Sequence, residues 1–230
     1  MKMAIANDEA FNFYYRANVD ALRQLGEVVF FSPLHDSIFP LAPTGDTKES
    51  FAKSNTDAQD DTDKLLYLPG GYPELFLEEI KENIYMRQQI KEYAESGGKV
   101  FAECGGFMYL CREIDGSPMC GVLPFKATMN GARLHLGYRQ MELNGMTIKG
   151  HEFHYSDIVT EELGEKNESG TTNALVNKES AADIEIITNQ KTAKNKDVST
   201  AIYRYKNVIA GYTHWYWGET GFPYACWYGE

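Results

Sequence analysis

Residues 99–110, KVFAECGGFMYL, join a run typical of a β-strand to a run typical of a helix through a cysteine and two glycines. A strand, a tight turn and a helix form a nucleophile elbow, which places the reactive side chain at the turn and requires small residues two positions before and after it. Those positions are Ala102 and Gly106, and the residue at the turn is Cys104. The stretch therefore predicts an α/β protein with Cys104 as a nucleophile.

A buried structural cysteine is the alternative, because an isolated cysteine is most often a small core residue. That alternative does not explain why Cys104 has small neighbours on both sides and a helix directly after it. A helix N-terminus lowers the pKa of a thiol, so we expect Cys104 to be held as a thiolate. We interpret the remaining cysteines, Cys111, Cys120 and Cys226, as packing residues.

Strand-like and helical runs alternate on the N-terminal side of the elbow. Repeated strand, helix, strand units predict a mostly parallel sheet flanked by helices. The expected strands are residues 2–6, 27–31, 65–68 and 99–103, and the expected helices are residues 7–26, 72–98 with a break near Asn83, and 107–114.

The sequence changes character after Asp115, where short runs rich in β-branched and aromatic residues predict a smaller β-rich region. We treat residues 1–230 as a single domain. The remaining expectations are a surface loop or short helix at 42–63, a surface hairpin region at 161–200 with strand candidates at 174–176 and 183–188, and two strands at 198–219.

Composition excludes several classes of partner. The formal net charge of −11 argues against binding nucleic acid or an anionic membrane. The chain has no CxxC pair and no His/Cys cluster with zinc spacing, so we expect no metal site. Neither a signal peptide nor a long apolar run is evident, which favours a reducing cytoplasm.

Acyl transfer to a cysteine also needs hydrogen-bond donors that stabilise the oxyanion formed when the sulfur attacks the carbonyl carbon. The N–H of Gly105 comes with the elbow, and Gly70 and Gly71 form a second glycine-rich turn after a predicted parallel strand. Such turns share the carboxyl edge of a parallel sheet, so the two turns are expected to lie close together. The alternative is a plain turn that allows a helix to start at Pro73.

A histidine is the expected base, and the chain has five. His35 follows a strand end and is expected at the surface, while His135 is expected to be structural. His151 and His154 lie in the run GHEFHYS, and His214 directly follows an apolar strand. The residues themselves leave His154 and His214 open as the base.

Four ordered motifs together resemble a known family, the glutamine amidotransferase domain of cobyrinic acid a,c-diamide synthases. The opening runs IANDEAFNFYY and FFSPLHD are also similar to the start of that domain. The resemblance extends from about Ala4 to Ile158 and continues more weakly to His214. The motifs are GGYPE (70–74), AECGGFMYL (102–110), LGYR (136–139) and GHEFHYS (150–156).

The resemblance implies a class I, flavodoxin-like glutaminase fold in which Cys104 attacks the side-chain amide of glutamine. His214, in the motif Tyr-Thr-His, would be the base, with His154 in reserve. The N–H groups of Gly71 and Gly105 would hold the oxyanion. We also assign Gly70 and His154 to substrate binding, although GHEFHYS could instead face a macrocycle or a partner domain, or be structural.

Two departures from the family pattern stand out. Triad amidotransferases place a glutamate two residues after the histidine, but this chain has Tyr216 there, and Glu219 is out of register. The chain also lacks the phosphate-binding run GxxxxGK[ST], so ATP and Mg²⁺ are expected on a separate synthetase domain or subunit, and no cofactor in this chain.

The sequence thus predicts the glutaminase component of an ATP-dependent amidotransferase. Its ammonia would amidate the a and c carboxylates of cobyrinic acid, a corrinoid that the partner would hold. Three alternatives stay open: a stand-alone thiol hydrolase, a non-catalytic binding module of the same fold, and an amidotransferase with another acceptor, such as a peptidoglycan precursor or another tetrapyrrole.

Overall fold

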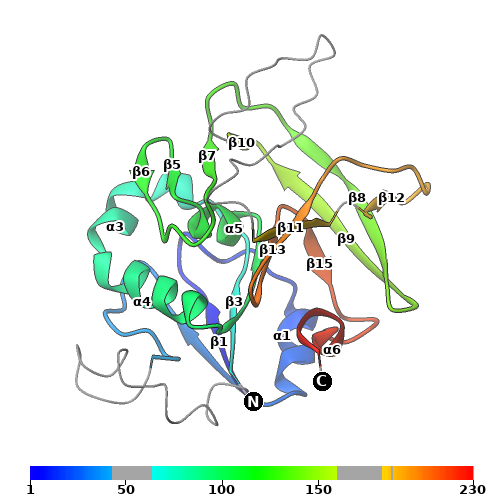
Figure 1. The fold of residues 1–230 in the computed structure, drawn as a ribbon, viewed down its shortest axis with the longest axis horizontal. Helices are drawn as coiled ribbons and strands as arrows, with labels where there is room; N and C mark the ends of the chain where they lie inside the picture. The colour runs from blue at the N-terminus through cyan, green and yellow to red at the C-terminus, as the bar shows by residue number, and fades with distance from the viewer. Residues whose placement is uncertain (43–63, 160–182, 188, 230) are drawn as a thin grey trace.

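A central seven-stranded sheet organises the computed structural model, which describes residues 1–42, 64–159, 183–187 and 189–229 (Figure 1). Five neighbouring strands are parallel, and the two at one edge are antiparallel additions. In spatial order the strands are β11 (Ile184–Ile187), β13 (Ile202–Tyr205), β14 (Val208–Gly211), β4 (Lys99–Glu103), β3 (Lys64–Leu68), β1 (Lys2–Ala6) and β2 (Glu27–Phe31).

Helices cover both faces of this sheet. Alternate residues of each parallel strand point to opposite faces, so Val100 packs into one apolar cluster and Phe101 into the other. The first cluster lies under α3 (Leu77–Glu82), α4 (Ile84–Glu95) and α5 (Gly105–Leu110), and the second under α1 (Arg16–Arg23) and α6 (Tyr224–Tyr228). No helix among the described residues is long and apolar enough to cross a membrane.

Two smaller sheets form the β-rich region that the sequence predicts. The first contains β12 (Lys191–Thr192), β8 (His135–Leu143), β9 (Met146–His154) and β15 (His214–Tyr216); the second contains β10 (Asp157–Val159), β7 (Lys126–Thr128), β5 (Glu113–Ile114) and β6 (Ser117–Pro118). Asn144 and Gly145, with φ of 49° and 80°, form the two-residue turn of the β8–β9 hairpin.

The predicted helix at 7–26 is wrong in its first half, because α1 begins only at Arg16. The carboxylate of Asp8 accepts hydrogen bonds from the N–H groups of Ala10 (2.9 Å) and Phe11 (3.1 Å), which fixes a turn that competes with a helix. Phe13 then exchanges backbone hydrogen bonds with Gly70. The segment after β1 therefore joins the glycine-rich turn.

The structure differs from the sequence prediction at three further places. The helix expected to reach Ile114 ends at Leu110, because the chain turns back to form β5. The last region holds three strands and α6 rather than two strands. β11 extends the central sheet instead of forming a surface hairpin.

The predicted helix break at Asn83 is confirmed, since its side chain accepts the N–H of Met86 (3.3 Å) at the start of α4. The 3₁₀ helix η1 (Pro73–Leu75) precedes α3. The expected loop at 43–63 and the strand candidate at 174–176 lie outside the described residues.

Candidate active site

The strand, tight turn and helix predicted around Cys104 are all present. β4 ends at Glu103 and α5 begins at Gly105, so Cys104 stands between them with φ 47° and ψ −107°. A positive φ is rare for a residue with a side chain, and such strained positions cluster at functional sites. The N–H of Cys104 donates to the carbonyl of Gly211 at the end of β14 (2.8 Å), which anchors the turn to the sheet.

The glycines beside Cys104 are required by close packing against the neighbouring turn. A Cβ on Gly106 would lie 2.2 Å from the carbonyl oxygen of Leu68, and one on Gly105 would lie 2.8 Å from the carbonyl oxygen of Gly71. A side chain at position 106 would thus clash with the end of the adjacent strand β3. Gly71 and Gly105, the two predicted oxyanion donors, are consequently in direct contact.

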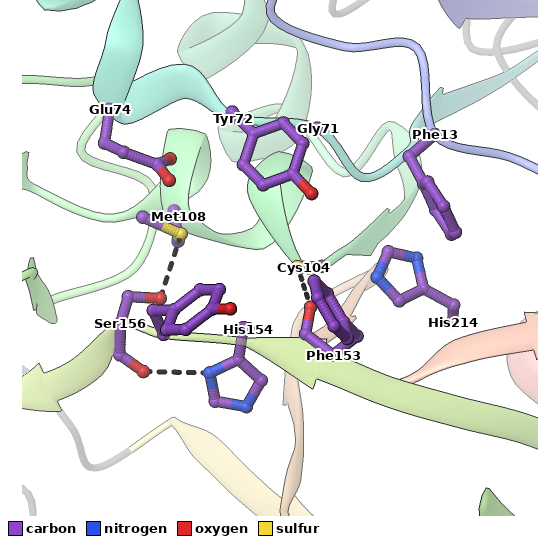
Figure 2. A pocket seen from close by; sticks show the side chains of 11 residues that line it. Phe13, Gly71, Tyr72, Glu74, Cys104, Met108, Phe153, His154, Ser156 and His214 are labelled. Carbon is purple, nitrogen blue, oxygen red and sulfur yellow. Dashed lines mark hydrogen bonds between the residues drawn. The ribbon is translucent and has the colours of Figure 1, made fainter. Parts of the chain in front are cut away.

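A single pocket brings most of the predicted site residues together (Figure 2). The Cys104 thiol lies against β9 and donates a long hydrogen bond to the carbonyl of Phe153, with 3.8 Å between sulfur and oxygen. The residues that line the pocket are Phe13, Gly71, Tyr72, Glu74, Cys104, Met108, Phe153, His154, Tyr155, Ser156 and His214.

The expectation that Cys104 is held as a thiolate is wrong. Burial raises the pKa of its thiol to about 12, and the negative charge of Glu74 adds to this effect. The N–H of Gly105 opposes the rise, but a six-residue helix and one hydrogen bond do not offset the desolvation. The resting nucleophile is therefore a neutral thiol that needs a base.

His214 is a neutral imidazole held in a cage of rings. Its side chain packs on His151 (4.8 Å between ring centroids) and against the ring of Phe13 (4.7 Å). A Cβ on Gly70 would lie 2.2 Å from His214 Cε1, so only glycine leaves room for the ring. Burial lowers the pKa of His214 to about 3, with the neighbouring His151 contributing, so the resting ring is neutral.

Neither Glu219 nor Tyr216, which stands in the place of the triad glutamate, supplies an orienting carboxylate for His214. Glu219 is exposed and pairs with Lys149 (2.7 Å), and Tyr216 packs edge-on against Tyr15. Among the described residues, the buried Nδ1 atom of His214 has no hydrogen-bond partner. Within the part of the chain that the structure describes, ring packing rather than a carboxylate contacts the imidazole.

Glu103 is a residue of the site that the sequence reasoning missed. Its buried carboxyl accepts a hydrogen bond from the N–H of Trp215 (2.9 Å) and one from the hydroxyl of Tyr67 (2.7 Å). Burial raises the pKa of Glu103 to about 8. The sequence does contain a signal for this residue: Glu103 is an acidic residue at the end of an otherwise apolar strand, directly before the nucleophile.

Asn18 on α1 holds the other side of the strand that carries His214. Its side chain donates to the carbonyl of Trp215 (2.7 Å) and accepts from the N–H of Trp217 (2.8 Å). Glu103 and Asn18 together satisfy backbone groups on β15 and just after it, and both side chains are buried. The position of His214 is thus set by two buried polar side chains.

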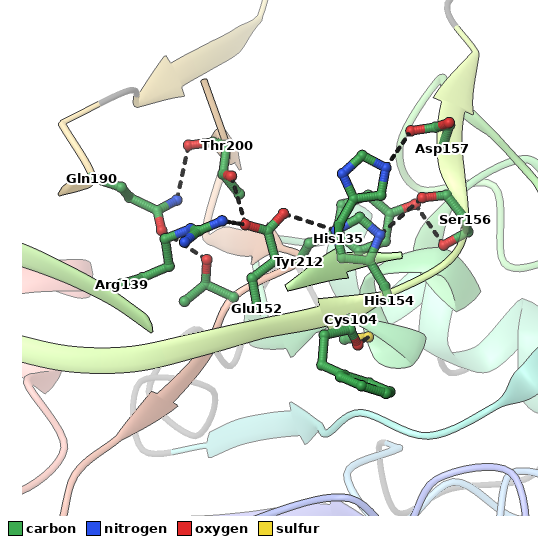
Figure 3. A network of polar contacts seen from close by, with 12 residues as sticks. Cys104, His135, Arg139, Glu152, His154, Ser156, Asp157, Gln190, Thr200 and Tyr212 are labelled. Carbon is green, nitrogen blue, oxygen red and sulfur yellow. Dashed lines mark hydrogen bonds and ion pairs between the residues drawn. The ribbon is translucent and has the colours of Figure 1, made fainter. Parts of the chain in front are cut away.

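His154 lies at the centre of a polar network on the opposite wall of the pocket (Figure 3). One ring nitrogen is hydrogen-bonded to the carboxylate of Glu152 and the other to the carbonyl of Ser156, both at 2.8 Å. Both ring nitrogens of His154 are therefore engaged by neighbouring oxygen atoms. The ring also stacks on Tyr212, with centroids 3.7 Å apart.

Glu152 is the counter-ion of this network. Its carboxylate pairs with Arg139 and accepts a hydrogen bond from the hydroxyl of Thr200 (2.8 Å). Burial would raise its pKa, but the hydrogen bonds from His154 and Thr200 and the charge of Arg139 lower the pKa to about 2. Glu152 is therefore a carboxylate across the pH range of most enzymes.

Three potential metal ligands also meet here. The ligand atoms of His135, Glu152 and His154 lie within 4.8 Å of one another. A metal requires a free histidine nitrogen, but both nitrogens of His154 are hydrogen-bonded to Glu152 and Ser156, and Arg139 already pairs with Glu152. The arrangement suits an ion-pair network and not a metal.

The structure separates the predicted site residues into two groups. Gly71, Cys104, His154 and His214 line the pocket. Gly70 contacts His214, but its N–H donates to Phe13 (3.1 Å) and is not available to a substrate.

The remaining histidines behave differently. His35 is exposed and pairs with Glu9 (2.9 Å). His135 lies 3.1 Å from Asp157 and stacks on His154. His151 is opposite His214 in the β9–β15 pair, and burial lowers its pKa.

The chain belongs to the family of CobB/CobQ-like glutamine amidotransferase domains, which matches residues 2–222. This assignment agrees with the α/β fold, the cysteine elbow and the glycine-rich turn described above. The family resemblance expected from the four sequence motifs is confirmed.

Curated proteins similar to this chain include cobyrinate a,c-diamide synthases. The one from Clostridium acetobutylicum is 38% identical over 170 residues, which cover 70% of this chain and 34% of that protein. The one from Methanocaldococcus jannaschii is 40% identical over 167 residues, covering 69% of this chain and 32% of that protein. The matched part of the chain thus spans about a third of the length of these relatives.

Solved structures with a related arrangement include a glutamine amidotransferase, with a TM-score of 0.45 and 17% identity over 92% of this chain and 89% of that one. PurLQS from Thermotoga maritima has a TM-score of 0.49 and 14% identity over 93% of this chain and 86% of that one.

Proposed function

We propose that this chain hydrolyses L-glutamine through a thioester on Cys104 and supplies the ammonia to an ATP-dependent synthetase. The observation that carries the proposal is that the elbow cysteine and the neutral, buried His214 line one pocket in a chain of the amidotransferase family. We propose that residues 1–230 form one glutaminase domain.

The mechanism begins with proton transfer from the Cys104 thiol to His214, because the thiol is neutral at rest. The sulfur attacks the side-chain carbonyl carbon of glutamine, and the resulting oxyanion accepts hydrogen bonds from the N–H groups of Gly71 and Gly105. His214 returns the proton to the departing nitrogen, which leaves as ammonia. Water, deprotonated by the same imidazole, then cleaves the γ-glutamyl thioester and releases glutamate.

The geometry favours His214 over His154 as the base. Both nitrogens of His154 are already hydrogen-bonded, one to Glu152 and the other to Ser156, so neither is available to Cys104. His214 is neutral, and its Nδ1 has no partner among the described residues. His154 instead provides a fixed wall of the substrate pocket, close to the carbonyl of Ser156.

A synthetase partner is supported by the length of the relatives and by the rim of the pocket. The relatives are about three times as long as the part that matches this chain. Phe13, Tyr72 and Tyr155 line the pocket and are each 41–43% exposed, an apolar rim suited to being covered by another domain. We propose that this partner binds ATP and Mg²⁺.

The acceptor follows from the names of the relatives, which are cobyrinate a,c-diamide synthases. We therefore propose the a and c carboxylates of cobyrinic acid as the groups that receive the ammonia, with the corrinoid held by the partner. All four cysteines are free, which supports a reducing cytoplasm as the compartment.

Glutamate release, measured with and without an added ATP-binding synthetase, tests the function. We expect release to depend on Cys104 and to rise when the partner is present. Equal turnover with and without the partner would favour the stand-alone hydrolase. Absence of both turnover and Cys104 alkylation by a glutamine-like diazo ketone would favour the binding module.

A further inference from the structure

Glu74 is an acidic side chain of the pocket that the mechanism above does not use. It lies in the 3₁₀ helix η1, and Figure 2 shows its carboxylate pointing toward the interior of the pocket. Its Oε2 atom is buried, and among the described residues no donor reaches it. The pocket therefore holds an acidic group without a partner.

A buried carboxylate oxygen without a partner is costly, because it has lost its water and gained no hydrogen bond. Burial raises the pKa of Glu74, the backbone N–H of Glu74 itself opposes the rise, and the charge of Asp115 adds to it. No lysine, arginine or histidine in the described part of the chain forms an ion pair with it. The structure thus retains an unfavourable charge that a cationic ligand would stabilise.

The other charged groups in the pocket do not compensate for Glu74. His154 is held by the carboxylate of Glu152 and the carbonyl of Ser156, both at 2.8 Å, so neither of its nitrogens is available to Glu74. His214 is neutral, since burial lowers its pKa to about 3. Glu74 is consequently the one uncompensated charge among the described lining residues.

We propose that Glu74 binds the α-ammonium group of L-glutamine and so selects an α-amino acid amide over a simple amide. The inference rests on the proposed function, because it takes glutamine as the molecule whose amide faces Cys104. The ammonium lies at the end of glutamine remote from that amide. A single molecule thus presents an electrophilic carbon to the thiol and a cation to the unpaired carboxylate.

The amine-free analogue glutaramate isolates this contact, since it keeps the amide and the carboxylate and lacks only the ammonium. Charge-assisted hydrogen bonds in a partly buried site correspond to a binding preference of about 10- to 100-fold. We expect the chain to prefer L-glutamine over glutaramate by that factor and Glu74→Gln to remove the preference while keeping the affinity for glutaramate.

The experiment measures binding of both molecules by calorimetry in the full chain carrying Cys104→Ala, which prevents turnover. Glu74→Gln is added to that chain, and Glu79→Gln, an exposed glutamate on α3, is the matched control. Thermal unfolding of the free chain is a second readout. Removing an unpaired buried charge should leave the melting temperature unchanged or raise it.

Equal binding of L-glutamine and glutaramate, binding of neither, or a preference that survives Glu74→Gln would each overturn the inference. Loss of both ligands in Glu74→Gln would do so too, because the amide end of the site should remain intact.

Glutamate release by the chain with Cys104 in place is assayed separately. A glutaminase whose preference ignores Glu74 contradicts this inference alone, whereas Glu74-dependent binding without turnover contradicts the proposed function alone.

Discussion

Glu103, the residue directly before Cys104, accepts a 2.9 Å hydrogen bond from the backbone N–H of Trp215, the residue directly after His214. The residues next to the two proposed catalytic residues are thus hydrogen-bonded to each other. Glu103 ends β4 in the central sheet, and Trp215 lies in β15 of a smaller sheet. This buried contact fixes the imidazole relative to the thiol without a carboxylate on the histidine itself.

Replacing Glu103 tests this connection. Glu103→Ala leaves the N–H of Trp215 and the hydroxyl of Tyr67 buried without an acceptor, so it should lower the free energy of unfolding by about 1–3 kcal/mol. It should also lower kcat for glutamate release more than it raises KM. Urea unfolding and steady-state kinetics measure both effects, and Glu103→Gln should recover most of the activity. A catalytically normal Glu103→Ala would contradict the positioning role.

Glu103 also predicts how stability changes with pH. Its pKa rises from its ordinary value of 4.5 to about 8 in the folded chain, so the folded state holds the proton more tightly than the unfolded state. The contribution of Glu103 to the free energy of unfolding should therefore be fully present below pH 4.5 and should fall as the pH rises toward 8. Unfolding free energies at several pH values should show a smaller decline for Glu103→Gln than for the parent chain.

The reactivity of Cys104 toward iodoacetamide should be low at neutral pH. Burial raises the pKa of the thiol to about 12. Below that value, the thiolate fraction grows about tenfold for each unit by which the pH is raised. Mass spectrometry of the peptide that contains Cys104 measures the alkylation rate from pH 7 upward. Fast modification that reaches a plateau near pH 7 would show an ionised thiol and contradict the buried, neutral nucleophile.

The two candidate bases should give different kinetic signatures. His214→Ala should lower kcat by about 10²- to 10⁴-fold, the usual contribution of a general base. His154→Ala removes a ring stacked on Tyr212 and the partner of Glu152, and should chiefly raise KM and lower stability. Rapid acid quenching with radiolabelled glutamine detects the thioester. Thioester formation by His214→Ala at the parental rate would exclude His214 as the base.

Gly70 should tolerate no side chain. In Gly70→Ala the new Cβ would lie 2.2 Å from His214 Cε1, so the imidazole must move away from its present position. We expect glutamate release to fall strongly while circular dichroism remains that of the folded chain. Gly131→Asn is the control, because that glycine has open space around it and asparagine accepts its positive φ of 75°. Equal activity of Gly70→Ala and the parent would contradict the close packing.

The sequence predicted features that depend on local pattern. The elbow at Cys104 follows from a strand, small residues and a helix start that are adjacent in the chain. The helix break at Asn83 is likewise local. The glycine-rich turn could be placed beside the elbow because parallel strands bring their carboxyl ends to one edge.

Features that depend on distant partners were not predicted. The start of α1 at Arg16 reflects the pairing of Phe13 with Gly70, which are far apart in sequence. The neutral state of Cys104 arises from burial by the whole fold rather than from the short helix after it. The two hydrogen bonds of His154 require Glu152 and a carbonyl in the following turn, and no sequence pattern states that both ring nitrogens are occupied.

Acid-quenched mass spectrometry of the chain mixed with L-glutamine tests the central claim most directly. The account predicts a γ-glutamyl group on the peptide that contains Cys104, and no adduct and no glutamate release in Cys104→Ala. Glutamate release that persists in Cys104→Ala, or an adduct on another cysteine, would contradict it.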